Sequence, residues 1–247
     1  MKPIKHQKSA THEQYEEEMR QHLTSHTLSP SYIANNFAKY TDRYQMTRFL
    51  ARHDLYKKIL SIKGNIIECG VLSGNGLMSW ARLSSILEPV AFNRRIFGFD
   101  TFDGFPSVHE KDRSNLQFSW AKGDLKDACY EELLECIRLY DIDRFISHIS
   151  KVNLIRGDFM ETSKQFLEEH PYTLIALLYL DFDLYEPTKQ SLEIFLPRMG
   201  KDSIICIDEL NNPKFPGETL AILEKLILKD YRIEKFEYDP SMAFIVL

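Results

Sequence analysis

The segment "TLIALLYLDFDLYEPT" (residues 173–188) joins an apolar run of strand length to two acids that follow it directly. The apolar run predicts a buried strand, because short continuous apolar runs are typical of strands covered on both faces. Asp181 and Asp183 stand two residues apart where the run stops. A carboxylate inside a sheet is costly unless it is paired. The acids are therefore expected at the tip of the strand rather than within the sheet.

The same pattern recurs along the chain and predicts an α/β fold. Strands are predicted over residues 64–70, 94–100, 151–158, 173–181 and 202–209, and helices over 74–87, 160–170, 186–199 and 217–230. Strands that alternate with helices of about three turns predict βαβ units and a mostly parallel, twisted sheet with helices on both faces. Residues 231–238 and 242–247 predict a closing strand pair, which adds an antiparallel C-terminal strand.

Two regions depart from this alternation. Residues 1–60 predict a helical N-terminal arm or cap, whose first 30 residues are polar. Residues 61–247 then form the main domain. Within it, residues 105–150 are charged and break the rhythm of strands and helices, so they predict an insertion. Long insertions of this kind often act as lids over a site.

Composition limits the classes of partner and the compartment. The chain has 247 residues and a formal net charge of −5, and a nucleic-acid-binding domain would be expected to be basic. No stretch is long and apolar enough to span a bilayer, and the N-terminus lacks the apolar core of a signal peptide. The four cysteines form no C-x-x-C pair. We therefore expect a cytoplasmic protein without disulfides that binds neither nucleic acid nor membrane.

Acids also follow the other predicted parallel strands. The carboxylates at these strand ends belong to Glu68, Asp100, Asp158, Asp181, Asp183, Asp208 and Glu209. Ligands of open parallel sheets bind in the crevice beyond the carboxyl ends of the strands, so these groups are expected to share one site. The alternative for any single acid is a helix cap or turn, because Asp satisfies free backbone N–H groups there.

The turn after the first strand indicates the kind of ligand. "ECGVLSGNG" (68–76) places Gly70, Gly74 and Gly76 where the backbone can approach a ligand closely. It matches neither the dinucleotide pattern G-x-G-x-x-G nor a P-loop. Glu68 would repel a phosphate but suits an amine, and Asp100 at the tip of the second strand could accept from two ribose hydroxyls. An amine and a ribose without phosphate point to S-adenosylmethionine (SAM).

Five motifs in order resemble the macrocin O-methyltransferase family. They are "ECGVLSGNG", "FGFDTFDGFP", "RGDF", "YLDFDLYEPT" and "ICIDELNNPKFPGE", and the similarity covers roughly residues 40–245. The resemblance implies a Rossmann-like class I methyltransferase fold. It also implies a SAM-dependent, metal-assisted O-methyltransferase that acts on a hydroxyl of a small molecule, such as a sugar, nucleotide-sugar or glycan of a biosynthetic pathway.

The resemblance also assigns residues to roles. Cofactor binding falls to Glu68, Gly70, Ser73, Gly74, Asp100 and Asp158, with Asp158 near the adenine. A divalent metal, expected to be Mg²⁺, falls to Asp181, Asp208 and Glu209. The family's familiar pattern has two aspartates at 208 and 209, and the longer glutamate here changes the geometry available to magnesium.

The two-residue spacing of Asp181 and Asp183 would allow the two acids to take different roles in one site. If the strand stays extended, their side chains lie on the same side, about 6.5 Å apart. Asp181 could then hold the metal, while Asp183 acts as general base on the acceptor hydroxyl. Asp183 could instead cap the helix that follows, and the two roles are compatible. Chelation by EDTA is expected to abolish turnover and to spare binding of S-adenosylhomocysteine (SAH).

Other functions and features stay open at this point. A NAD-dependent oxidoreductase on a similar sheet is disfavoured by the missing G-x-G-x-x-G. A non-catalytic SAM- or metal-binding scaffold would have no need of Asp183. The acceptor depends on the insertion 105–150 and the N-terminal helices, which carry no motif with a known mechanism. The helical N-terminus suggests a homodimer.

Overall fold

The protein is described from a computed structural model, which describes residues 10–26, 28–114 and 119–247. Two compact units divide the chain, Met1–Arg48 and Phe49–Leu247. The first contains α1 (Ala10–Ser25), α2 (Pro30–Asn35), η1 (Phe37–Lys39) and the first residues of α3 (Arg43–Lys58). The start of α2 follows the usual chemistry of a helix start, since Pro30 opens it and the Ser29 side chain accepts from the Tyr32 N–H.

The second unit is built on one seven-stranded sheet of order β3-β2-β1-β4-β5-β7-β6. The strands are β1 (Asn65–Cys69), β2 (Ile96–Asp100), β3 (Val152–Arg156), β4 (Ile175–Leu180), β5 (Met199–Ile207), β6 (Ile233–Lys235) and β7 (Ala243–Val246). The first five are parallel, and β7 pairs antiparallel with both β5 and β6. This confirms the predicted fold class, including the antiparallel strand at the C-terminal end.

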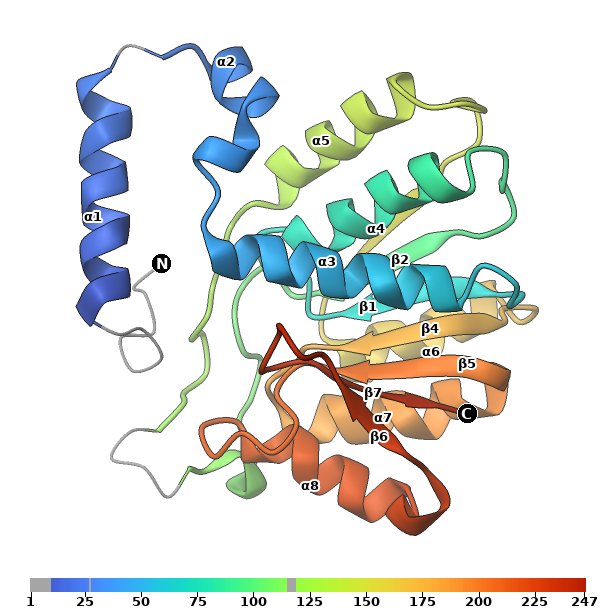
Figure 1. Cartoon of the computed structure of the whole chain (residues 1–247). Coiled ribbons are helices and arrows are strands. Elements are labelled where there is room, and N and C mark those ends of the chain that lie inside the picture. Colours follow the sequence, from blue (N-terminus) through green and yellow to red (C-terminus); the bar gives the residue numbers. More distant parts are fainter. Residues whose placement is uncertain (1–9, 27, 115–118) are drawn as a thin grey trace. The chain divides into compact units, whose positions relative to one another are not determined.

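Helices cover both faces of the sheet (Figure 1). They are α4 (Asn75–Leu87), α5 (Tyr130–Ile142), α6 (Phe159–Glu169), α7 (Tyr185–Phe195) and α8 (Pro216–Lys225), with short turns η2 (Glu110–Asp112), η3 (Leu196–Arg198) and η4 (Leu228–Asp230). Residues of α3, α4 and α5 share one apolar cluster with one face of the sheet, and residues of α6, α7 and α8 share another with the opposite face. Alternate side chains of a strand point to opposite faces, so each strand supplies both clusters.

The predicted insertion contributes to the core as well as to the surface. Its helix α5 buries Leu133, Ile137 and Tyr140 in the same cluster as α3 and α4. That part of the insertion is therefore a layer of the fold rather than a cover above it. The division into residues 1–60 and 61–247 with a lid-like insertion stays a prediction.

Buried Arg and Lys side chains lie at the amino ends of the parallel strands. Arg94, just before β2, is 6% exposed and donates to Glu88 Oε2 at 2.7 Å. It also donates to the carbonyls of Gly64, Ile59 and Ile62. Lys151, just before β3, is 4% exposed and donates to the Ala91 carbonyl at 2.7 Å. Carbonyl groups at this edge therefore satisfy the cations.

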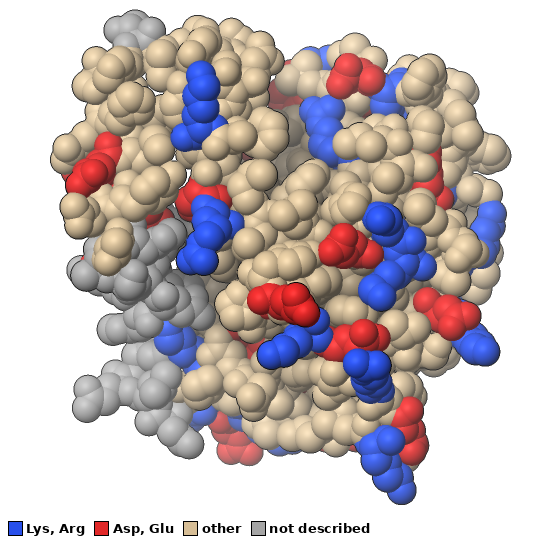
Figure 2. All heavy atoms as spheres, viewed as in Figure 1, with Lys and Arg blue, Asp and Glu red and all other residues tan. Residues whose placement is uncertain are grey.

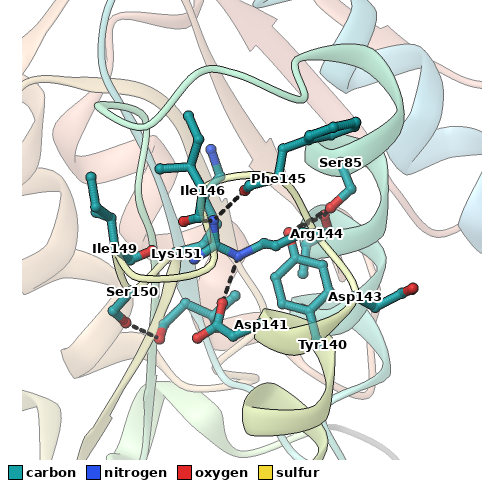
Figure 3. A network of polar contacts seen from close by, with 12 residues as sticks. Ser85, Tyr140, Asp141, Asp143, Arg144, Phe145, Ile146, Ile149, Ser150 and Lys151 are labelled. Atoms are coloured by element: carbon teal, nitrogen blue, oxygen red, sulfur yellow. Dashed lines mark hydrogen bonds and ion pairs between the residues drawn. The ribbon is translucent and has the colours of Figure 1, made fainter.

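Figure 3 shows the polar network around Lys151. Arg144 donates to Asp141 Oδ1 at 2.6 Å and to carbonyls of its own loop. The Tyr140 hydroxyl donates to the Ala81 carbonyl at 2.8 Å and accepts from Ser85. The network fastens the end of α5 to α4, so it serves the fold at the edge opposite the strand-end acids.

Candidate active site

A cavity of about 820 Å³, open to solvent, lies at the carboxyl ends of β1, β2, β3 and β4. Its wall includes Gly70, Asp100, Asp158, Asp181 and Asp183, five of the residues predicted for the site. Much of the remaining wall is apolar and comes from Leu72, Phe99, Phe105, Pro106, Leu125, Phe159, Met160, Phe182, Leu184 and Pro187. The structure thus brings acids from the ends of β2, β3 and β4, together with the glycine turn after β1, around one pocket.

The turn after β1 approaches the end of β4 very closely. Gly70 has φ +88°, and a Cβ atom added to it would lie 1.9 Å from the Asp181 carbonyl oxygen. Gly74 begins α4 with φ +83°, where a Cβ would meet Leu133 at 2.5 Å. Only glycine adopts these angles without strain, so the turn depends on its glycines.

Asp100 lies at the centre of this turn. Its Oδ2 accepts from the N–H groups of Val71 and Leu72 at 2.7 and 2.8 Å, and its Oδ1 accepts from the Phe102 N–H at 2.7 Å. Leu72 and Phe102 both have positive φ, 49° and 54°. The carboxylate therefore ties the turn after β1 to the loop after β2, both of which contribute to the cavity wall.

Asp158 lies both at the cavity and at the start of a helix. It lines the cavity and is also the N-cap of α6, where its Oδ1 accepts from the Met160 N–H at 2.9 Å. The cap accounts for one carboxylate oxygen. The cap does not use the other oxygen, so capping of the helix and binding of a ligand are compatible at Asp158.

Three residues predicted to bind cofactor lie outside the cavity wall. Glu68 is 2% exposed, and its Oε1 would be 2.4 Å from a Cβ added to Gly76. The Ser73 hydroxyl donates to Asp127 Oδ2 at 2.8 Å. Gly74 serves the start of α4. The roles of Glu68, Ser73 and Gly74 in binding cofactor stay predictions.

Asp183 follows β4 in an unusual backbone conformation. Its φ is 62°, in the left-handed region that few residues other than glycine, asparagine and aspartate adopt. Burial raises the pKa of Asp183 well above its ordinary value, and the charges of Asp181, Glu218, Glu209 and Asp208 raise it further.

The acids after β5 lie close enough to affect Asp183 but do not line the cavity. Asp208 is 4% exposed, and its Oδ1 accepts from the Tyr179 hydroxyl at 2.7 Å. The Glu209 carboxylate accepts from the Asn212 side-chain amide. Tyr179 itself is fully buried and accepts from Arg52 Nη2 at 3.4 Å. These contacts anchor the loop after β5 to the core.

The donor type suits magnesium, but the arrangement does not form a metal site. Carboxylate oxygens are the ligands that magnesium prefers. Within residues 10–26, 28–114 and 119–247, however, no three His, Cys, Asp or Glu side chains are arranged to hold a metal ion. Binding of Mg²⁺ by Asp181, Asp208 and Glu209 therefore stays a prediction, and no step proposed below depends on it.

Two buried carboxylates of this region were missed by the sequence reasoning. Glu218 in the first turn of α8 is fully buried, and Asp112 in η2 is 2% exposed. Burial raises the pKa of Glu218 to about 8, with the negative charge of Asp208 as a further cause. An acid in the first turn of a helix is ordinary, so the sequence contains no signal that this one is buried.

The surface and helices bear on the predicted partners. Figure 2 shows Lys and Arg side chains beside Asp and Glu on the face it draws, rather than gathered in one block. None of the helices in the described part of the chain is both long and apolar enough to cross a bilayer. The predictions of a cytoplasmic location, of no nucleic-acid or membrane partner, and of a homodimer stay predictions.

Comparison with known proteins gives two kinds of match. Residues 5–215 match the macrocin O-methyltransferase (TylF) family. A Streptomyces olivaceus enzyme, 8-demethyl-8-(2,3-dimethoxy-alpha-L-rhamnosyl)-tetracenomycin-C 4'-O-methyltransferase, is 28% identical over 152 residues. The aligned part is 60% of this chain and 53% of the relative, so it spans about half of that enzyme's length.

Solved structures extend the likeness over the whole chain. The calicheamicin methyltransferase CalS11 has a TM-score of 0.92 and 35% identity, covering 97% of this chain and 93% of its own. A second, apo structure of CalS11, described as a TDP-rhamnose 3'-O-methyltransferase, has a TM-score of 0.83, 32% identity, and coverage of 97% and 95%. The O-methyltransferase NovP, at 21% identity, a TM-score of 0.56, and coverage of 81% and 78%, shares the fold. The chain belongs to the macrocin O-methyltransferase family.

Proposed function

We propose that the protein is a SAM-dependent O-methyltransferase that methylates a sugar hydroxyl, on a nucleotide-sugar or glycan of a biosynthetic pathway. Family membership supports methyl transfer from SAM. The sugar acceptor is supported by the relatives, since one acts on a rhamnosyl group and CalS11 is described as acting on TDP-rhamnose. The observation that carries the proposal is the single cavity that holds the Gly70 turn, Asp100 and Asp183 together.

The cavity has features that suit the cofactor. Gly70 allows the backbone to approach a bound molecule closely, because it has no side chain in the way. Phe159 and Phe182 belong to the cavity wall, and their ring centroids lie 4.7 Å apart. Such walls bury the apolar parts of a nucleoside. Bound SAM would supply the electrophilic methyl group.

The contacts of Asp100 refine its expected role toward the ribose. A carboxylate has about four positions at which it can accept a hydrogen bond. Three are taken by the N–H groups of Val71, Leu72 and Phe102. We infer that Asp100 accepts from one ribose hydroxyl, through Oδ1, rather than from two.

Asp183 is the residue proposed to act on the acceptor. It would accept the proton of the sugar hydroxyl as the oxygen attacks the methyl carbon, so that the proton ends on its carboxylate. General-base help of this kind contributes about 10²–10⁴-fold in rate. Holding the hydroxyl, the methyl carbon and the sulfur in line would supply much of the rest.

Methyl transfer from SAM to TDP-rhamnose, followed by mass spectrometry, tests the proposal. Wild-type protein is expected to add one methyl group and to form SAH, and SAH but not NAD is expected to raise the melting temperature. No transfer to TDP-rhamnose or to a panel of glycans, despite SAH binding, would favour a scaffold. Stabilisation by NAD alone would favour an oxidoreductase.

Chelation decides the separate question of magnesium. If the resemblance extends to the metal, EDTA will abolish turnover, added Mg²⁺ will restore it, and SAH binding will be unchanged. Turnover that persists in EDTA would show that Asp181, Asp208 and Glu209 do not act as metal ligands in the reaction.

A further inference from the structure

Buried carboxylates of two distant segments accept hydrogen bonds from the backbone after β4. Glu218 Oε1 accepts from the N–H groups of Phe182 and Asp183, at 2.9 and 3.1 Å. Asp112 Oδ1 accepts from the Tyr185 N–H at 2.6 Å. Three of the four backbone N–H groups from 182 to 185 thus donate to two side chains from other parts of the chain.

Glu218 also reaches the neighbouring strand end. Its Oε2 accepts from the Glu209 N–H at 3.2 Å, while its Oε1 serves the segment after β4. One fully buried carboxylate therefore links the loops that follow β4 and β5. Hydrogen bonds from backbone N–H groups to a carboxylate are stronger than those between neutral groups, so this link restricts both loops.

Asp112, in the insertion between β2 and β3, accepts from the later part of the same segment. Its Oδ2 accepts from the His109 N–H at 2.8 Å, which completes a capping box in η2. A Cβ added to Gly217 would lie 2.0 Å from Asp112 Oδ1 and 2.6 Å from the Tyr185 nitrogen. The absence of a side chain at Gly217 is what allows α8, η2 and the start of α7 to meet.

The segment held in this way contains the strained residue. A left-handed conformation is costly for a residue other than glycine and persists only where the surroundings impose it. Asp183 has this conformation and is one of the residues that line the cavity. The hydrogen bonds that Glu218 and Asp112 accept from this segment are contacts that can impose the conformation.

We propose that Glu218 and Asp112 are positioning residues, which hold Asp183 in its left-handed conformation so that its carboxylate faces the acceptor. This inference rests on the proposed role of Asp183 as general base. A purely structural role, in which the two acids only satisfy buried N–H groups, is the alternative.

A double-mutant cycle separates the two roles. Glu218→Gln keeps the shape of the side chain but leaves only one oxygen to accept hydrogen bonds. With SAM and TDP-rhamnose, it is expected to lower kcat about 10-fold or more while changing the SAH Kd less than threefold, because misplacing a catalytic group costs rate before binding. In the Asp183→Asn background it should cause no further loss. An equal loss in both backgrounds would overturn the proposal.

Matched variants guard against an effect of stability alone. Asp112→Asn removes one of the two carboxylate oxygens of the residue that accepts from Tyr185. Like Glu218→Gln, it is expected to lower kcat with little change in the SAH Kd. Glu88→Gln alters a half-buried carboxylate at the opposite edge, which accepts from Arg94 and Tyr56, and should lower the melting temperature without lowering kcat. Wild-type kcat in both Glu218→Gln and Asp112→Asn would overturn the proposal.

A measurement without turnover completes the test. Hydrogen exchange of a peptide spanning residues 182–187 should speed up in Glu218→Gln and stay unchanged in Glu88→Gln. A crystal structure of Glu218→Gln that kept Asp183 at its present φ and position would overturn the inference. Failure of the proposed function gives a different result, since wild-type protein would then form no methylated product, whereas wild-type kcat in Asp183→Asn would count only against its role as general base.

Discussion

The two edges of the parallel sheet differ in the groups that surround their buried charges. At the amino edge, Arg94 and Lys151 are buried among backbone carbonyls, and Arg94 also pairs with Glu88. At the carboxyl edge, burial raises the pKa of both Asp183 and Glu218, and the charges of neighbouring carboxylates raise it further. Compensated charge at one edge serves stability, whereas accumulated like charge at the other is costly and is typical of a functional site.

Even within the carboxyl edge, two aspartates at equivalent places differ. Asp100 follows β2 and accepts from three backbone N–H groups. Asp183 follows β4 and has four acidic neighbours that raise its pKa. A carboxylate surrounded by N–H donors stabilises a turn and offers one further acceptor position. A carboxylate among other acids takes up protons more readily, which suits it for proton transfer.

The largest effect is expected from Asp183→Asn. Asparagine tolerates the left-handed conformation, so the substitution removes the base and keeps the backbone. We expect kcat to fall about 10²–10⁴-fold. The SAH Kd, measured by calorimetry, should not change. A kcat within threefold of wild type would remove the functional contrast between Asp183 and Asp100.

Arg94→Met tests the amino edge and should affect stability alone. The substitution leaves three carbonyls and Glu88 without their shared donor. Breaking a buried ion pair of this kind costs about 3–5 kcal/mol, which urea unfolding would measure. At a temperature where the variant is folded, kcat is expected to equal that of wild type. A large loss of kcat in fully folded Arg94→Met would show that the two edges are functionally coupled.

Asp100→Asn is expected to weaken cofactor binding. The amide offers one acceptor oxygen instead of two, and its NH₂ group faces N–H donors. Hydrogen bonds to charged groups contribute about 1.5–3 kcal/mol, so the SAH Kd should rise about 10–100-fold. Glu88→Gln is the control, since Glu88 accepts from Arg94 and Tyr56 at the opposite edge of the sheet. Equal losses of SAH affinity in both variants would show that the effect of Asp100→Asn comes from lost stability rather than from a lost contact to the cofactor.

The smallest effect concerns the pH dependence of stability at Lys151. Burial lowers the pKa of Lys151 from 10.5 to about 8. Between these values the unfolded chain binds more protons than the folded chain, so stability rises with pH there and is unaffected below about pH 8. Relative to Lys151→Met, the free energy of unfolding should rise by at most about 1.4 kcal/mol per pH unit. A flat difference from pH 8 to 10 would show that Lys151 stays protonated in the folded protein.

The direction of the parallel strands could be predicted from the sequence, because the evidence for it is local, whereas their order in the sheet was not predicted. The apolar runs and the helices between them predict parallel strands, and parallel strands present their ends at one edge. That reasoning placed Asp100, Asp158, Asp181 and Asp183 at a common edge, and all four line the cavity. Strand limits shifted by a few residues, as at β5, which begins at Met199 rather than 202.

The fine structure of the site depends on contacts between segments far apart in the sequence. Glu218 lies 35 residues from Asp183, and Asp112 lies 73 residues from Tyr185, yet each accepts from the backbone there. Nothing near either residue indicates that it is buried. Glu68 illustrates the reverse case, since its place next to the glycine turn suggested a ligand contact, whereas its side chain lies buried outside the cavity wall.

The amino-acid sequence by itself determined the class of the fold, the edge at which the acids gather and the family resemblance. Local periodicity and the chemistry of strand ends and helix starts are sufficient for these. Only the tertiary structure decided that Asp183 is left-handed, that Asp100 is mostly occupied by N–H donors, and that Glu218 joins two loops. These properties arise where distant segments exclude water together, and burial and proximity of that kind are not encoded in any single stretch of the chain.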